Sequence, residues 1–216
     1  MKTRNKALLL TFGAVLLGAA SVFGTLAYLT ATDEVVNTFT VGSVAIKLDE
    51  AKANPDGTLV ENADRVDKNS YKLLPGHTYA KDPMVTVLKD SEKSYIRMTV
   101  SFSNSAELDA IFEGEANMLE IFNGYDSATW LYKGNVEDVA ANTRTYEFWY
   151  KETVDTLNGN DLKLDALFDS ITVPGEITKE QLATINNMTI TVNAHAIQAD
   201  GFETADAAWA AFKPAA

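Results

Sequence analysis

Apolar and polar residues alternate along several stretches of this chain, and this alternation constrains the fold more than any other feature. The clearest stretch is 95–103, in which every second residue is large and apolar: Ile96, Met98, Val100 and Phe102. Successive side chains of a strand point to opposite faces, so the pattern predicts a strand with one buried face. Similar alternation is found at 35–41, 44–48, 145–150 and 188–196.

Turn signals separate these stretches, and helical spacing is confined to short segments. Asn54-Pro55-Asp56-Gly57, inside a polar loop at 49–70, and Leu74-Pro75-Gly76 are typical turn sequences. Short helices are expected within 106–122, at 162–168, from the capping-box sequence at 178–181 and at 204–212. The pattern predicts a mainly β protein, an antiparallel jelly roll or β-sandwich with short helical insertions. We expect a single domain at 28–216, with a helix-containing insertion region at 104–180.

Residues 1–27 have the three parts of a secretory signal peptide and would form a helix ahead of the domain. Lys2, Arg4 and Lys6 give a basic start, and an apolar run extends to residue 26. The run ends with small residues at Thr25 and Ala27, the two positions that a signal peptidase recognises, so Tyr28 would begin the mature chain. The alternative is an uncleaved membrane anchor, because about 20 apolar residues span a bilayer.

Charge and cysteine content exclude several classes of partner. The chain has 18 Lys and Arg against 30 Asp and Glu, a net charge of −12, and loss of the basic leader would make it more acidic. Nucleic acids and anionic membrane surfaces need clustered basic residues, so we expect neither as a partner; only an uncleaved leader would contact a membrane. Without cysteine, stability must come from the core, from assembly or from bound ions, as in many bacterial surface proteins.

A search for catalytic motifs gives no candidate site. His77 and His195 are far apart in sequence and lack the helical spacing of zinc ligands. There is no cysteine nucleophile, no G-x-S-x-G motif and no phosphate-binding glycine loop. Acidic loops with Asp155 and Asp161, or Asp64 and Asp67, could supply oxygen ligands for calcium, but they lack the EF-hand pattern and are interpreted as solvated turns. We therefore expect no enzyme activity, cofactor or metal.

The segment that follows the predicted cleavage site is the most informative part of the chain. Residues 28–41 would become a free N-terminal strand with no hairpin partner beside it in sequence. Its apolar residues Val35, Phe39 and Val41 fall on one face. Such a strand can pair with a sheet edge of its own molecule or of another, and the second alternative, repeated head to tail, produces a filament. The pattern alone leaves both alternatives open.

Several motifs resemble the TasA/camelysin family of exported proteins, which are processed by a SipW-type signal peptidase. The resemblance is carried by Gly24-Thr-Leu-Ala-Tyr-Leu-Thr30, Asn37-Thr-Phe-Thr-Val-Gly42, Val44-x-Ile-x-Leu-x-Glu50, Leu74-Pro-Gly76, Tyr79-x-Lys-Asp-Pro83, Val85-Thr-Val87, Tyr95-Ile-Arg97 and Ile197-Gln-Ala-Asp-Gly-Phe202. It covers 1–50 and 74–102 well, and the ending is similar to members from Gram-positive bacteria.

The resemblance implies a jelly roll, secretion to the extracellular matrix or cell surface, and polymerisation into biofilm-matrix fibres. Each subunit would donate residues 28–41 to the next, with Val35, Phe39 and Val41 as anchors, and an accessory or anchoring protein is a further possible partner. Two alternatives stay open. One is a soluble adhesin or ligand-binding β-sandwich. The other is a camelysin-like metallopeptidase, which the two isolated histidines do not favour because a zinc peptidase needs three protein ligands.

Overall fold

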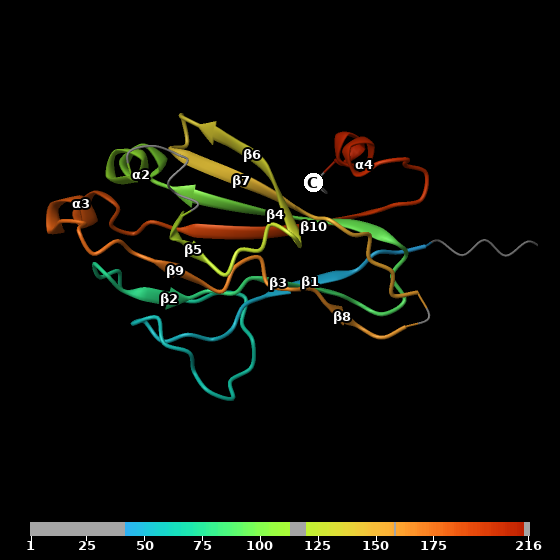
Figure 1. The fold of residues 1–216 in the computed structure, drawn as a ribbon, viewed down its shortest axis with the longest axis horizontal. Helices are drawn as coiled ribbons and strands as arrows, with labels where there is room; N and C mark the ends of the chain where they lie inside the picture. The colour runs from blue at the N-terminus through green and yellow to red at the C-terminus, as the bar shows by residue number, and fades with distance from the viewer. Residues whose placement is uncertain (1–41, 113–119, 158, 214–216) are drawn as a thin grey trace, which may run out of the picture. The chain divides into compact units, whose positions relative to one another are not determined.

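The computed structural model describes residues 42–112, 120–157 and 159–213, and the chain from Gly42 onward is one compact unit. The expected signal peptide, its recognition residues Thr25, Ala27 and Tyr28, and the segment 28–41 with Val35, Phe39 and Val41 lie outside the described residues. The described chain is mainly β, as predicted, with three antiparallel sheets and short helices (Figure 1). No helix within it has the length and apolar composition needed to cross a bilayer.

The largest sheet has four antiparallel strands in the order β10-β4-β7-β6. These strands are β4 (Ser94–Ser103), β6 (Trp130–Asp138), β7 (Thr143–Tyr150) and β10 (Ile190–Gln198). The predicted strands at 95–103, 145–150 and 188–196 are therefore confirmed within one or two residues. β7 lies between β4 and β6 and is therefore an internal strand of the sheet. The region 104–180, expected to be a helix-containing insertion, thus also contributes to the sheet itself.

Two smaller antiparallel sheets lie on one side of the large sheet (Figure 1). One has the order β1-β3-β8, with β1 (Ile46–Asp49), β3 (Met84–Val87) and β8 (Leu162–Lys163). The other has the order β2-β9-β5, with β2 (Thr78–Ala80), β9 (Ser170–Thr172) and β5 (Phe122–Asn123). Since each sheet pairs strands that are distant in sequence, the fold depends on long-range contacts.

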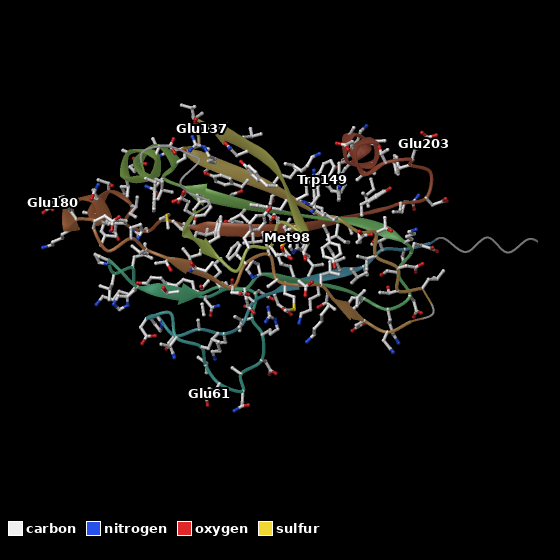
Figure 2. The ribbon with its side chains drawn as sticks, in the orientation of Figure 1. Glu61, Met98, Glu137, Trp149, Glu180 and Glu203 are labelled. Carbon is white, nitrogen blue, oxygen red and sulfur yellow. The ribbon has the colours of Figure 1, made fainter. Side chains whose placement is uncertain are left out.

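The core fills the space between the large sheet and the two small ones. The four alternating residues of β4 are at most 1% exposed, and Val85 and Val87 of β3 face them fully buried. Figure 2 shows Met98 in this central layer. Aromatic rings extend the core, including Phe122 stacked on Phe168 with centroids 4.3 Å apart. The predicted alternation therefore corresponds to the observed burial.

The helices are α2 (Ser105–Phe112), α3 (Lys179–Thr184) and α4 (Ala205–Ala211). The predicted capping box is present, because the Thr178 side chain accepts from the Gln181 backbone and the Gln181 side chain accepts from the Thr178 backbone. The predicted C-terminal helix is confirmed as α4, with Thr204 as its N-cap.

The helix predicted at 162–168 is wrong. This segment forms the short strand β8 and then continues in extended form along β3, where the backbone N–H groups of Leu164 and Leu167 donate to Val85 and Pro83. Leu164, Leu167 and Phe168 are all buried in the core from this extended backbone. Their spacing resembles that of a helix because a non-helical segment without regular strand pairing can also turn every third or fourth side chain inward.

The outer face of the large sheet is covered at one end by α4. Arg97 of β4 lies between two rings of the C-terminal segment, with its guanidinium carbon 4.6 Å from the Trp209 centroid and 4.7 Å from that of Phe212. Trp149 of β7, labelled beside α4 in Figure 2, adds a third ring 6.1 Å from Trp209. These cation–π and aromatic contacts hold α4 against the sheet.

His195 of β10 lies under the same cover, with its ring 5.1 Å from Phe212 and its Nδ1 atom buried without a hydrogen-bond partner. Burial lowers the pKa of His195 below its ordinary value, neighbouring Arg97 lowers it further, and Glu147 offsets part of the effect. The other histidine, His77, is exposed at the start of β2.

We expect the free energy of unfolding to decrease as the pH falls from about 7.5 to about 5.5. Because the folded pKa of His195 is lowered, the unfolded chain binds a proton that the folded chain resists, and stability is lost as the pH falls below the ordinary value of ~6.5. Urea unfolding across this range measures the effect. The His195→Leu variant should lose most of the pH dependence and the matched His77→Asn variant should keep it; equal slopes in both variants would contradict the prediction.

Candidate functional site: the free edge of β10

β10 is an edge strand whose outer side is unpaired in the described part of the chain. Its pairing with β4 runs from Ile190 opposite Phe102 to Gln198 opposite Ser94, and no other described strand pairs with it. A free edge presents a row of unpaired N–H and C=O groups to any strand that approaches. The nine residues of β10 include no Asp, Glu, Lys or Arg, so no charge protects this edge.

The opposite edge of the sheet, β6, is protected in two ways. Its register shifts between Tyr132 and Gly134, where Gly134 has a φ of 114°, and such a bulge bends an edge away from further pairing. β6 also carries Lys133, Glu137 and Asp138. Charges and bulges are the usual means of blocking edge-to-edge association. Of the two edges of the large sheet, β10 is therefore the one open to addition of a strand.

The core is incomplete beside β10. The inward residues Ile190, Val192, Ala194 and Ala196 are only partly buried, whereas their neighbours on β4 are almost fully buried. β1 passes close to β10 without pairing with it, so the large sheet and the small sheet are separated along this side. An added strand would bury apolar surface here as well as form hydrogen bonds.

A groove runs along the first half of β10, between the strand and the segment 67–73. It comprises hollows of about 220 and 460 Å³ that share Lys68, Asn69, Lys81, Ile190 and Thr191 in their walls. The first hollow also reaches Leu48 of β1, and the second reaches Leu73 and Met188. Its floor is the half-buried face of β10, and its rim carries the exposed amine of Lys68.

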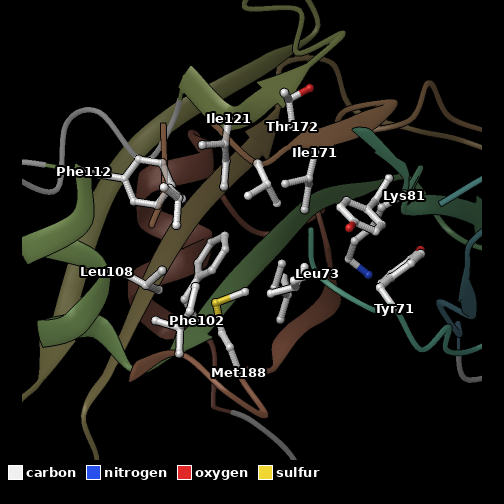
Figure 3. Close-up of a pocket in the computed structure, with 15 residues that line it drawn as sticks. Tyr71, Leu73, Lys81, Phe102, Leu108, Phe112, Ile121, Ile171, Thr172 and Met188 are labelled. Carbon is white, nitrogen blue, oxygen red and sulfur yellow. The ribbon is translucent and has the colours of Figure 1, made fainter. Parts of the chain in front are cut away.

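An apolar cavity of about 50 Å³ lies deeper, between the sheets (Figure 3). Lys81 and Tyr71 stand at one end of it, and Leu108 and Phe112 at the other. Small-molecule sites usually measure several hundred Å³, so this cavity is too small for a cofactor. The cavity and the groove share four lining residues: Tyr71, Leu73, Met188 and Ile190. The first three also line an adjoining hollow near Asn186. The cavity thus continues the groove into the core.

The wall of the groove is fixed by a clamp of charged residues. Arg65 donates to the carboxylates of Asp49 and Asp82, the latter at 2.8 Å, and to the backbone carbonyls of both residues. Burial alone would raise the pKa of Asp49, but hydrogen bonds from Lys47 and Arg65 outweigh it and hold that pKa below its ordinary value. The clamp joins the polar loop at 49–70, which has the predicted turn at 54–57, to β1 and to the start of β3.

A second polar set lies beside the clamp. Lys81 donates to Glu50 at 2.5 Å, and Asn69 donates to the other oxygen of the same carboxylate at 3.0 Å. Tyr71 donates to the Ala80 carbonyl at 2.6 Å, and burial raises the pKa of its hydroxyl well above the ordinary value. These contacts fix the segment 67–73 against β2 and complete the wall.

The sequence-predicted site residues and this groove are different parts of the chain. Val35, Phe39, Val41, Thr25, Ala27 and Tyr28 lie outside the described residues. His77 lies just before β2 and His195 lies in β10 of the large sheet. Within the described ranges no three His, Asp or Glu side chains are grouped so that they could hold a metal ion. The groove was not predicted; the absence of charge in 190–198 was the one available signal.

We expect Arg65→Ala to loosen the groove wall. The variant leaves the buried Asp49 without its guanidinium partner, and removal of one partner from a buried pair costs on the order of 3 kcal/mol in the free energy of unfolding. Urea unfolding measures this loss, and limited proteolysis should show faster cleavage within 51–72. The control is Lys52→Ala, an exposed charge in the same loop; an Arg65→Ala variant as stable as this control would contradict the clamp.

The arrangement therefore offers main-chain groups, apolar surface and a polar wall, and it suits an extended peptide better than a small molecule. No protein-family model, curated protein or solved structure matches this chain.

Proposed function

We propose that this chain is a secreted structural protein whose copies join head to tail into fibres of the cell surface or extracellular matrix. In this proposal 1–27 is a signal peptide, cleavage after Ala27 frees Tyr28, and residues 28–41 add as a strand to β10 of the next copy. The proposal includes a place in the TasA/camelysin family, its SipW-type peptidase and a jelly-roll arrangement of the sheets. The observation that carries it is β10, an uncharged free edge with a half-buried inner face.

The position of Gly42 favours exchange between copies. The backbone carbonyl of Ser43 accepts from the N–H of Glu92, and the N–H of Ala199, just after β10, donates to the carbonyl of the next residue, Lys93. The chain therefore enters the domain near the last residues of β10. The groove lies at the other end, beside Ile190. If 28–41 folded back along its own β10, it would therefore run parallel to it. A strand from a second copy is free to pair antiparallel, which is slightly more stable per residue.

Length and charge are compatible with this pairing. The 14 residues of 28–41 reach about 46 Å when extended, and the nine residues of β10 span about 30 Å. The charged residues of 28–41 are Asp33 and Glu34. The rim of the groove and its adjoining hollow present two exposed lysines, Lys68 and Lys72, against one exposed carboxylate, Asp67. Opposite charges would orient the incoming strand, while Val35, Phe39 and Val41 would cover the half-buried face of β10.

We expect filaments from a purified form that begins at Tyr28 and none from a form that begins at Val44. Only the first carries the donor segment, and negative-stain electron microscopy distinguishes the two results. If both forms stay monomeric, self-assembly fails and the adhesin alternative becomes the better one. If both form filaments, polymerisation survives and the donor-strand mechanism does not.

A second prediction tests the acceptor edge. Thr191→Lys places a charge in the groove wall on β10, and we expect it to prevent filaments in the form that begins at Tyr28. The matched control is Val136→Lys on the β6 edge, where the wild-type side chain is 75% exposed, and it should leave filaments intact. Both variants should remain folded by circular dichroism. Filaments from Thr191→Lys, or their loss in Val136→Lys alone, would place the contact on a different edge.

A further inference from the structure

Two side chains beside the groove are arranged around one buried carboxylate, that of Glu50. Lys81 Nζ donates to Glu50 Oε2 at 2.5 Å, and Asn69 Nδ2 donates to Glu50 Oε1 at 3.0 Å. The Lys81 and Glu50 side chains are 9% and 7% exposed. The two oxygens of one carboxylate thus hold an amine and a primary amide next to each other. An ion pair alone would not need the amide.

The amide of Asn69 is oriented by all of its polar atoms. Its Oδ1 accepts from the Ala53 backbone N–H at 2.9 Å, and its Nδ2 also donates to the Ala51 carbonyl at 2.8 Å. A donor on the amide oxygen draws electrons from the side-chain carbonyl carbon and would stabilise negative charge on that oxygen during attack by a nucleophile. The contacts to the nitrogen hold the leaving group toward Glu50. The hydrogen bond to Oδ1 therefore polarises the Asn69 carbonyl, and Glu50, which can accept and return a proton, lies against Nδ2.

We propose that Lys81 and Asn69 form an intramolecular isopeptide bond, with Glu50 as the catalytic proton carrier. Lys81 Nζ gives a proton to Glu50, and the neutral amine attacks Cγ of Asn69. The Nζ–Cγ bond forms, Glu50 delivers the proton to Nδ2, and the Cγ–Nδ2 bond breaks so that Nδ2 leaves as ammonia. The second proton that Nζ loses as it becomes an amide nitrogen passes to Glu50 and from there to the ammonia, which departs as ammonium. One amide replaces another, no atom is oxidised or reduced, and no co-reactant is needed.

The surroundings protect this reaction from competition. Lys81 lies at the end of the apolar cavity, beside Tyr71 (Figure 3), so its amine is shielded from water on that side. The nearby carboxylates of Asp49 and Asp82 are held by Arg65, which leaves Glu50 as the carboxylate in contact with Lys81. Glu50 also holds the Lys81 amine and the Asn69 amide close together in a fixed orientation, which lowers the barrier to attack.

The bond would join the segment 67–73 covalently to the end of β2. Lys81 follows β2 directly and is itself fixed to the sheet, because its backbone N–H donates to Asp169 at 3.1 Å. Asn69 lies in a segment without sheet pairing of its own. The groove wall would then be held by a covalent link as well as by the clamp. This inference is independent of the proposed function, because the bond forms within one chain whether or not copies assemble.

Peptide mass spectrometry of the purified full chain tests the proposal. Trypsin cleaves unmodified protein after Lys68, Lys72, Lys81 and Lys89, which releases 69–72, 73–81 and 82–89 as separate peptides. An isopeptide-linked Lys81 resists trypsin, so we expect a branched product of 69–72 joined to 73–89. Its mass is about 17 Da below the sum of the two, the mass of one ammonia. Fragmentation distinguishes this product from a linear peptide with missed cleavages.

Variants assign the role of each group. We expect Glu50→Gln to release the three separate peptides. Lys81→Met, which removes the tryptic site at 81, should release 69–72 and 73–89 as two unlinked peptides. The control Glu61→Gln, at an exposed carboxylate of the same loop, should keep the branched product. Folding of each variant is checked by circular dichroism, and the wild-type result stands without them. Folded wild-type protein with free Lys81, whether residue 69 is Asn or has been hydrolysed to Asp, overturns the proposal. A branched product in Glu50→Gln at the wild-type level overturns the role of Glu50.

Discussion

Burial of the inward face of β4 is the interaction on which the rest of this structure depends. Ile96, Met98, Val100 and Phe102 are at most 1% exposed, and each contributes roughly 1.5–3 kcal/mol relative to an exposed position. β4 also has pairing partners on both sides, β10 and β7, so its register sets theirs. Its opposite face carries Arg97, around which the C-terminal rings pack. One strand thus organises both layers and the helix that covers them.

The elements that could be predicted from the sequence are those whose signals are local. Alternation in 95–103 corresponds to β4, and Thr178 and Thr204 mark the starts of α3 and α4 because caps act within one turn. The helix predicted at 162–168 is wrong because Leu164 and Leu167 bond to Val85 and Pro83, about eighty residues earlier in the chain. The groove could not be predicted for the same reason. Its walls come from β1, 67–73 and 188–192, which no periodicity relates to each other.

The polar loop at 49–70 differs in structure from an ordinary surface loop. Its residues include Glu50 and Asn69, and Arg65 binds the carboxylate of Asp49 in β1 and that of Asp82 between β2 and β3. In sequence these residues look like a solvated, charged stretch, and the turn at 54–57 supports that impression. The structure shows that the loop folds back and places Glu50 and Arg65 inward, against β1 and the end of β2, while Lys52, Glu61 and Lys68 stay exposed. Charge content alone therefore did not distinguish a loop that is solvated from one that forms a buried wall.

The cover that α4 forms over the outer face has a consequence for growth by stacking. Many fibrous β assemblies thicken because sheets laminate face to face, about 10 Å apart. Here Trp209 and Phe212 already occupy part of the face that a second sheet would need, and Lys133 is tied to Asp206 of the same helix. Lamination would require the helix to detach from Arg97. If copies add strand to strand at β10 as proposed, this cover would let the assembly lengthen along a line and would oppose its broadening into a plaque.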